Sequence, residues 1–473
     1  MKILLLYDTK GSKAKNLMLE LEKNSNKIIY WVGAPGGEID NLPESIFHSS
    51  SDALLGLPAK NINISEFAPP SNNLIEKLYR TESLILTMMN AKYDNLRTSE
   101  RKHLYYEMLR YWYGILNKYK PDVVLHGLIP HAVHTFLIQE LARLLNIKTV
   151  MFEDTGASDR LLAFNDFRDG SKDLQREIKR NHGKNFSLKD LSNDIQKYYK
   201  SQLDFKHDST PVYVGVLKNR YTGSELLKRR LNRFRKSIQE GIFLKTIIQT
   251  IIKRFRKNSK DEYASLQAEP DLNKKFIYAP LHLQPECTTS PKGDLFVDQI
   301  LMLETLSAAL PKDWVIYVKE HPIQWYQRGT DFSGARYRGY YKKISEIKNI
   351  QLIPVQISTY TLINKSQAVA TVAGMASWEA VLRSKPAIIF GYSWYRDCYG
   401  VFKVDNIYSC SVALEKIASG FAVDQQQVIN YLKCFDDATI HGYLDVDYAK
   451  SSELTPEENK NNVIQKMLFE IKN

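Results

Sequence analysis

The chain has 473 residues, of which 44% are hydrophobic and 25% charged, and its formal net charge is +12. This length suits two domains of about 200 residues with a connector, and the composition excludes a wholly disordered or collagen-like chain. No apolar run approaches the roughly 18 residues that span a bilayer, and the four cysteines lack the C-x-x-C spacing of a zinc site, so we expect a chain that resides in a reducing cytosol.

The N-terminal region alternates short apolar strands with amphipathic helices. Apolar runs such as KILLLYD and PDVVLHG are typical of buried strands, and the segments between them carry apolar residues at helical spacing. This alternation predicts βαβ units with a parallel sheet. The predicted elements are strands at 2–8, 27–33, 121–127 and 149–154, and helices at 81–118 and 131–146.

A basic segment follows. Between Lys218 and Lys260 there are 14 lysines and arginines and two acids, so this segment accounts for the whole net charge of the chain. Leu, Ile and Phe recur among the cations near helical spacing, as in a basic amphipathic helix on an anionic membrane surface. A helical linker whose apolar stripe packs on its own protein fits the same pattern. Nucleic-acid binding is a weaker alternative, because no recognition motif accompanies the charge.

The C-terminal region repeats the alternation. Strands are predicted at 275–281, 313–322, 349–355, 368–374 and 386–391, and helices at 294–310, 376–386 and 455–473. We therefore predict an α/β fold with two Rossmann-like, doubly wound domains that face each other across a cleft. The predicted divisions are an acceptor domain at 1–205, a basic linker or insertion at 206–270, a nucleotide-binding domain at 271–440 and a C-terminal helix at 441–473.

The turn after the predicted strand 368–374 is a candidate phosphate site. Gly374 ends the strand, Ser377 stands near the start of the next helix, and Glu379 lies in its first turn. Small residues let a ligand approach the backbone, and the amides at a helix start favour an anion. The alternative is an ordinary strand-turn-helix in which Ser377 only caps the helix.

Two further polar groups follow predicted strands of the same region. Lys319, Glu320 and His321 cluster at one strand end, where Pro322 fixes the turn, and could neutralise a phosphate or simply be solvated. In the loop 279–294, polar side chains could contact a sugar or a base, or could belong to a plain connector. The candidates in that loop are Gln284, Glu286 and Thr288.

The N-terminal region offers its own candidates after two strands. His131 and His134 lie three residues apart at a helix start, which is a weak basis for a metal site. Glu153 and Asp154 are adjacent carboxylates at a strand end beside Gly156. Either carboxylate could take a proton from an acceptor hydroxyl, or could cap local backbone instead.

Three short motifs resemble those of bacterial GT-B glycosyltransferases of capsule and surface-carbohydrate biosynthesis, including Kdo transferases, and of sialyltransferases that use CMP-sugars. FEDTG (152–156) is similar to the acidic motif that supplies the general base, with Thr155 inserted before the glycine. VKEHP contains the His-Pro pair at His321. AGMAS (373–377) is similar to the Ser/Thr-rich motif, with one serine in place of a pair.

The resemblance implies a metal-independent glycosyltransferase without a cofactor other than its nucleotide-sugar donor. The donor would be a CMP-activated Kdo or another nonulosonic acid, and the acceptor a lipid-linked capsule, lipopolysaccharide or other surface glycan at the inner face of the cytoplasmic membrane. Glu153 or Asp154 would act as base, with His131 as a secondary candidate. The implied donor-binding residues are Gln284, Glu286, Lys319, Glu320, His321, Pro322, Gly374, Ser377 and Glu379.

Two alternatives stay open. Glu379 also fits the G-x-x-x-x-E-A context of retaining enzymes, so a UDP-sugar transferase or 2-epimerase of the same fold is the nearest rival. A non-catalytic membrane- or polysaccharide-binding partner is the other.

Overall fold

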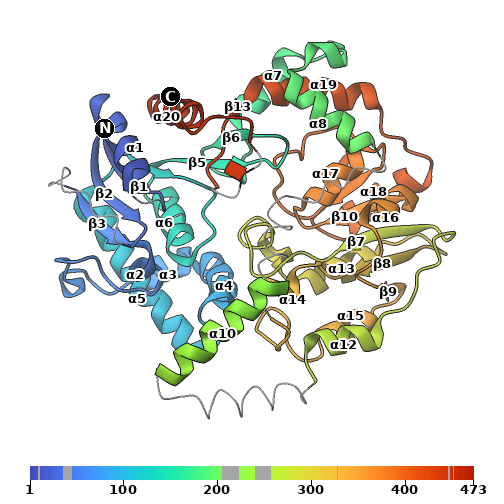
Figure 1. Cartoon of the computed structure of the whole chain (residues 1–473), viewed down its shortest axis with the longest axis horizontal. Coiled ribbons are helices and arrows are strands. Elements are labelled where there is room, and N and C mark those ends of the chain that lie inside the picture. The colour runs from blue at the N-terminus through green and yellow to red at the C-terminus, as the bar shows by residue number, and fades with distance from the viewer. Residues whose placement is uncertain are drawn as a thin grey trace.

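The computed structural model describes residues 1–8, 11–35, 45–204, 223–239, 257–327, 329–445, 448–450 and 452–473. Two β-sheets, each flanked by helices, form two lobes that lie side by side (Figure 1). The predicted α/β class with two Rossmann-like domains is confirmed, because both sheets are mainly parallel and are built from strands that alternate with helices.

The first sheet has the strand order β13-β6-β5-β4-β1-β2-β3. The five strands from β5 to β3 in this order are parallel. At the opposite edge, β6 pairs antiparallel with β5, and β13 pairs antiparallel with β6. The crevice between β1 and β4, where the winding direction reverses, is the position at which such sheets bind ligands. The strands are β1 (Lys2–Leu6), β2 (Lys27–Gly33), β3 (Ile46–Ser49), β4 (Val123–His126), β5 (Lys148–Asp154), β6 (Arg160–Phe164) and β13 (Ile440–His441).

The second sheet is parallel throughout its described strands, in the order β12-β11-β10-β7-β8-β9. This is the doubly wound order of dinucleotide-binding domains, with its switch point between β7 and β10. Its four central strands, β11, β10, β7 and β8, are nearly all apolar and buried, as expected for a sheet with helices on both faces. They are β7 (Phe276–Pro280), β8 (Val315–Lys319), β9 (Ile350–Leu352), β10 (Ala368–Thr371), β11 (Ala387–Ile389) and β12 (Val401–Lys403).

The sequence predicted two helices in the first lobe, and the structure differs from one of these predictions and adds α1, α2 and α3. The single helix expected at 81–118 is two α-helices, α4 and α5, separated by a 3-10 turn (Met89–Ala91) and a short loop. In this interruption Arg101 Nε donates to the Leu96 carbonyl at 3.0 Å, so a side chain satisfies a backbone group there. The helices are α1 (Gly11–Lys23), α2 (Ser50–Leu54), α3 (Asn72–Lys77), α4 (Tyr79–Met88), α5 (Thr98–Tyr119) and α6 (Val133–Leu144).

Helices from both halves of the chain cover the second lobe. Those of residues 172–203 lie beside α19 and α17 at the top of Figure 1, and their apolar side chains share one core with the first lobe. The helices are α7 (Lys172–Arg180), α8 (Asn193–Leu203), α12 (Ser259–Leu266), α13 (Gln299–Ala308), α14 (Gln324–Gln327), α15 (Tyr340–Glu346), α16 (Thr359–Lys365), α17 (Met375–Leu382), α18 (Ile407–Ala418) and α19 (Gln425–Ala438).

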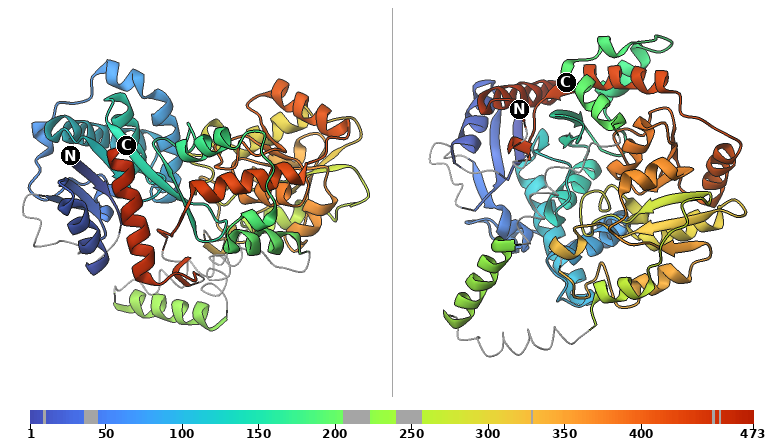
Figure 2. Two further views of the ribbon diagram at one scale, coloured as in Figure 1. Left: turned by 90° about the horizontal axis from the view of Figure 1, so that it is seen from above. Right: turned by 45° about the vertical axis from the view of Figure 1, so that its right-hand side comes forward.

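The chain returns to the first lobe at its C-terminal end. Helix α20 (Pro456–Lys472) lies against α1 and the first sheet, near the N-terminus (Figures 1 and 2). The predicted capping box is confirmed, because Glu458 N donates to Thr455 Oγ1 at 3.2 Å and Thr455 N donates to Glu458 Oε2 at 2.9 Å. Met467 and Ile471 are fully buried on the sheet.

Helix α10 (Gly223–Gln239) is the described part of the predicted basic amphipathic helix. The rest of that prediction, at 218–222 and 240–256, falls outside the described residues. Figure 2 shows α10 at the margin of the molecule, projecting from the two lobes. Its Leu227, Leu231 and Ile238 are 55–60% exposed. Among the helices that the structure describes, none combines the length and the apolar character that a membrane crossing requires.

Candidate functional site

The switch point of the second sheet holds two of the predicted segments together. The loop after β7 places His282 against the turn after β10, where the backbone N–H of Val372 donates to His282 Nε2 at 2.9 Å. Burial lowers the pKa of His282 to about 3, so its ring is neutral and accepts this bond. Gly374 is required here, since any side chain at this position would collide with the imidazole.

Ser377 and Glu379 lie inside the second lobe. The Ser377 hydroxyl is fully buried and shares a 2.8 Å hydrogen bond with Thr371 Oγ1. Glu379 is 9% exposed. Met375, just before these residues in the chain, reaches the other lobe. If Gly156 carried a Cβ atom, that atom would lie 3.5 Å from Cε of Met375. The start of α17, rather than the serine hydroxyl, therefore faces the first lobe.

Lys319 is 3% exposed at the end of β8. Its Nζ donates to the Ile357 carbonyl at 2.8 Å and to Thr359 Oγ1 at 2.7 Å. Burial lowers its pKa to about 8. These bonds tie the end of β8 to the segment that starts α16, so in this structure the Lys319 ammonium holds the strand end.

Glu320 and Gln284 form a buried network around Arg336, which the sequence analysis did not single out. Glu320 Oε2 accepts from Arg336 Nε at 2.7 Å and from Tyr341 Oη at 2.5 Å. Gln284 Oε1 accepts from Arg336 Nη1 at 2.7 Å. Both predicted donor-binding side chains thus fix the loop after β7 to the loop after β8 from within.

His321, Pro322 and Glu286 stay nearer the surface. The backbone N–H of His321 donates to Glu320 Oε1 at 2.7 Å, which orients the turn. Burial lowers the pKa of His321, while the charge of Glu286 opposes that shift, so the two side chains are close enough to interact. Glu286 and Pro322 are exposed.

Glu153 connects the lobes. Its Oε1 lies 2.5 Å from Nζ of Lys292, which comes from the loop after β7. Lys292 is 6% exposed; burial disfavours its charge, but attraction to Glu153 outweighs burial and raises its pKa. Lys292 stands within the loop that the sequence analysis considered, yet only the folded chain brings it to the acidic motif.

Asp154 faces the opposite side of β5. Its Oδ1 accepts from the Leu444 backbone N–H at 3.0 Å and its Oδ2 from that of Asp445 at 2.9 Å. Burial raises its pKa to about 7, although these two amides favour the charged form. Asp154 therefore holds the segment that leads to α20, whereas Glu153 points toward the second lobe.

The two histidines of the first lobe are not equivalent. His131 is exposed and its Nδ1 lies 2.8 Å from the Ile129 carbonyl oxygen. His134 is buried, and burial lowers its pKa to about 3. Within the residues that the structure describes, no group of three or more His, Cys, Asp or Glu is placed to hold a metal ion.

The structure thus brings part of the predicted site together at the interface of the lobes. Glu153 of the first lobe contacts Lys292, and Gly156 lies beside Met375. Tyr448 also belongs here, because its hydroxyl would stand 3.8 Å from a methyl group on Gly156. No sequence pattern marks Tyr448 or Lys292, since neither stands in a motif.

A family model matches part of the chain. Residues 221–412 match the family model described as "Capsule polysaccharide biosynthesis protein". This range contains the second sheet and the segments around Lys292, His321 and Gly374, and its description agrees with the capsule group that the motifs resemble. No curated protein sequence matches the chain.

Several solved structures are similar at low scores. A structure described as Thermosulfurimonas dismutans KpsC, beta Kdo 2,7 transferase, is 11% identical over 77% of this chain and 88% of its own, with a TM-score of 0.30. A trehalose-phosphate synthase from Burkholderia vietnamiensis is 10% identical over 100% and 96%, with a TM-score of 0.29. UDP-GlcNAc 2-epimerase from Methanocaldococcus jannaschii is 15% identical over 88% and 92%, with a TM-score of 0.23. Scores this low transfer neither activity nor ligand.

Proposed function

We propose that this chain is a glycosyltransferase of capsule or other surface-polysaccharide biosynthesis that uses a nucleotide-sugar. The observation that carries the proposal is the contact of Glu153 with Lys292, which joins an acidic strand end of one lobe to the switch-point loop of the other. The capsule family match over residues 221–412 supports the substrate class. Following the motif resemblance, the donor is a CMP-activated Kdo or another nonulosonic acid.

Glu153 is the general base in this proposal. The acceptor hydroxyl oxygen bonds to the anomeric carbon of the donor, the bond from that carbon to the phosphate oxygen breaks, and the hydroxyl proton passes to Glu153. Asp154 is less suited to this role, because both of its oxygens already accept from the backbone at Leu444 and Asp445. His131 is an exposed secondary candidate for orienting the acceptor.

The leaving nucleotide phosphate would lie on the second lobe. Lys292 and His321 border the loops after β7 and β8, and the amides that begin α17 add the positive end of its dipole beside Gly374. These groups can stabilise the charge that develops on the phosphate without a divalent ion. Gln284, Lys319, Glu320 and Ser377 would act indirectly, by fixing these loops.

The test combines ligand binding with transfer. We expect CMP to raise the melting temperature of the chain more than UDP, GDP or dTDP, since a ligand that binds only the folded state stabilises it. We expect Glu153→Gln to lower transfer from a CMP-sugar by at least about 100-fold while leaving the CMP shift in place. Stabilisation by UDP alone would favour the UDP-sugar transferase or 2-epimerase. A chain inert to all four nucleotides would favour a non-catalytic binding partner.

We also propose that α10 holds the chain at an anionic membrane surface. Successive residues of a helix are rotated by about 100°, which places Leu227, Leu231 and Ile238 within about 40° of one another. The exposed Arg235 and Lys228 border one side of this apolar stripe, at about 80° and 100° from Leu227. An exposed apolar stripe bordered by cations is the arrangement of helices that lie in a lipid interface.

Vesicle co-sedimentation tests the membrane proposal. We expect the chain to sediment with vesicles that contain phosphatidylglycerol and less with pure phosphatidylcholine vesicles. Neutralising Arg229, Arg230, Arg233 and Arg235 together should abolish the difference. The matched control neutralises four exposed lysines of the second lobe, Lys312, Lys342, Lys343 and Lys348. Equal sedimentation of the two quadruple variants would refute a specific role for α10.

A further inference from the structure

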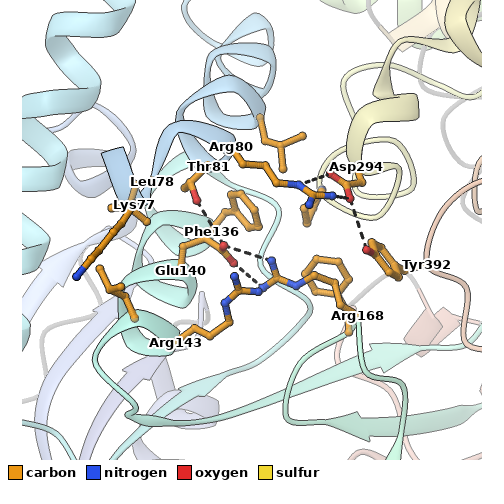
Figure 3. A pocket seen from close by; sticks show the side chains of 14 residues that line it. Lys77, Leu78, Arg80, Thr81, Phe136, Glu140, Arg143, Arg168, Asp294 and Tyr392 are labelled. Atoms are coloured by element: carbon orange, nitrogen blue, oxygen red, sulfur yellow. Dashed lines mark hydrogen bonds and ion pairs between the residues drawn. The ribbon is translucent and has the colours of Figure 1, made fainter. Parts of the chain in front are cut away.

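A second feature of the interface is a cavity of about 580 Å³ that both lobes line. The first lobe contributes residues around α4 and α6 and the loop after β6, and the second lobe contributes Pro291, Asp294 and Tyr392 (Figure 3). Its volume lies within the range of about 300–1,000 Å³ that is usual for small-molecule sites.

The lining of this cavity carries more positive than negative charge. Four cations line it, Lys77, Arg80, Arg143 and Arg168, against two carboxylates, Glu140 and Asp294. Two of the cations are already paired. Arg168 binds Glu140 at 2.5 Å and Asp166 at 2.7 Å, and Arg80 pairs with Asp294 across the lobes.

The other two cations are available to a ligand. Among the described residues, the side chains of Arg143 and Lys77 make no hydrogen bond or ion pair. Arg143 reaches from α6 toward Arg168 and Glu140 at the centre of the cavity (Figure 3). Its charge is near enough to contribute to the lowered pKa of Asp166, behind the stronger effect of Arg168.

Aromatic side chains complete the cavity. The rings of Phe167 and Tyr392 pack edge to face, with centroids 5.7 Å apart, and Phe136 lines the wall of the first lobe. Aromatic rings beside the unpaired guanidinium group of Arg143 suit a sugar that carries a negative charge.

The cavity also adjoins the proposed reaction centre. Pro291 and Asp294 line it, and Lys292 between them contacts Glu153. The Lys292 carbonyl accepts from the backbone N–H of Tyr392, another lining residue, at 2.8 Å. The same short loop therefore lines the cavity, through Pro291 and Asp294, and contacts Glu153, through Lys292.

We infer that this cavity binds an acidic group of the acceptor, a carboxylate or a phosphate attached to a sugar, with Arg143 as its principal unpaired cation. That the bound group belongs to an acceptor rests on the proposed glycosyltransferase function. The anion site itself depends only on the geometry of the cavity. Arg143 and Lys77 set the charge preference, and the aromatic rings bind the sugar that bears the charge.

Calorimetric titration of the full chain with glucuronate, glucose 6-phosphate and glucose tests this site without requiring transfer. We expect at least one of the two anionic sugars to bind, and glucose not to. Arg143→Gln should weaken that binding by at least about tenfold, which is what losing one charge-assisted hydrogen bond costs. Arg338→Gln removes an exposed arginine outside the cavity and should leave binding unchanged.

The outcomes separate the two proposals. Binding of glucuronate alone identifies a carboxylate site, and binding of glucose 6-phosphate alone identifies a phosphate site. Absence of binding by both, equal binding of glucose, or equal effects of the two arginine variants would overturn the inference. The CMP-induced melting shift is measured on the same variants. If that shift is absent while the anion still binds, the proposed function fails and the anion site stands.

Discussion

Two adjacent carboxylates in this chain have different surroundings because they lie on a strand. Successive side chains of a strand point to opposite faces, so Met151 and Glu153 share one side of β5 while Phe152 and Asp154 share the other. Phe152 belongs to the core beneath α20, and Met151 to the core that continues into the second lobe. The same alternation that buries these apolar residues separates the proposed base from a carboxylate that binds backbone.

Asp154 should make the stability of the chain depend on pH. Its folded pKa of about 7 lies above the unfolded value of 3.8, so the folded chain binds more protons between these values. Stability should therefore fall as pH rises from 4 to 7, by about 1.4 kcal/mol for each unit of the pKa difference. We expect Asp154→Asn to flatten this fall in a plot of melting temperature against pH. Asp169→Asn, at an exposed position, should keep the wild-type slope, and parallel curves for all three proteins would contradict the prediction.

Glu320 should be needed for stability. It is fully buried and is the carboxylate partner of Arg336, which is 1% exposed. Removing one partner of such a pair leaves an uncompensated charge, so Glu320→Gln should lower the free energy of unfolding in urea by about 3 kcal/mol. Glu346→Gln breaks an exposed pair with Lys342 and should cost less than about 0.5 kcal/mol. Equal losses in the free energy of unfolding for the two variants would show that the buried pair contributes no more to stability than the exposed pair.

The chemistry of individual side chains was less predictable than their positions. The sequence places Ser377 and Lys319 correctly at a turn and at a strand end, but their hydrogen bonds go to Thr371, Thr359 and a backbone carbonyl. Those partners are set by how the elements pack. Arg336 and Lys292 stand in no motif, so only the folded chain identifies them as the partners of Glu320 and Glu153.

At the scale of elements, short apolar runs predicted most of the parallel strands, but not β3 and β12, which lie at sheet edges and are only partly buried. The antiparallel edge was not predictable. Strand β13 has two residues, and it pairs with β6 nearly 280 positions earlier in the chain. The expected helix 81–118 is interrupted between α4 and α5, where the Arg101 side chain donates to the Leu96 carbonyl.

Helix α20 should contribute to stability through one face. Met467 is fully buried on the first sheet, whereas Phe469 on the same helix is 50% exposed. Met467→Ala should lower the free energy of unfolding by about 2–5 kcal/mol, and Phe469→Ala by less than about 1 kcal/mol. Chemical denaturation of both variants checks this difference. A larger loss of stability for Phe469→Ala would contradict the prediction that the face with Met467 packs on the sheet.

At the scale of the molecule, one apolar core extends through both lobes. It includes residues of β5 and α6 as well as Trp378, Trp394 and Phe435. An indole also bonds across the boundary, since Trp394 Nε1 donates to the Thr155 carbonyl at 3.1 Å. The lobes should therefore unfold together.

Calorimetry checks this cooperativity. We expect one heat-absorption peak whose calorimetric and van't Hoff enthalpies agree. Trp394→Ala should move the whole peak to lower temperature, because removing a buried tryptophan costs about 3–5 kcal/mol. Two resolved transitions, with only one of them displaced by the substitution, would mean that each lobe has an independent core.

The return of β13 and α20 to the first sheet has a consequence for synthesis of the chain. The face that α20 covers belongs to strands made from the first 164 residues, but Ile464, Met467 and Ile471 are synthesised only after the whole second sheet. The first lobe therefore cannot finish folding before α20 has been synthesised, and its apolar face must stay shielded, by a chaperone or by transient contacts, until that helix emerges.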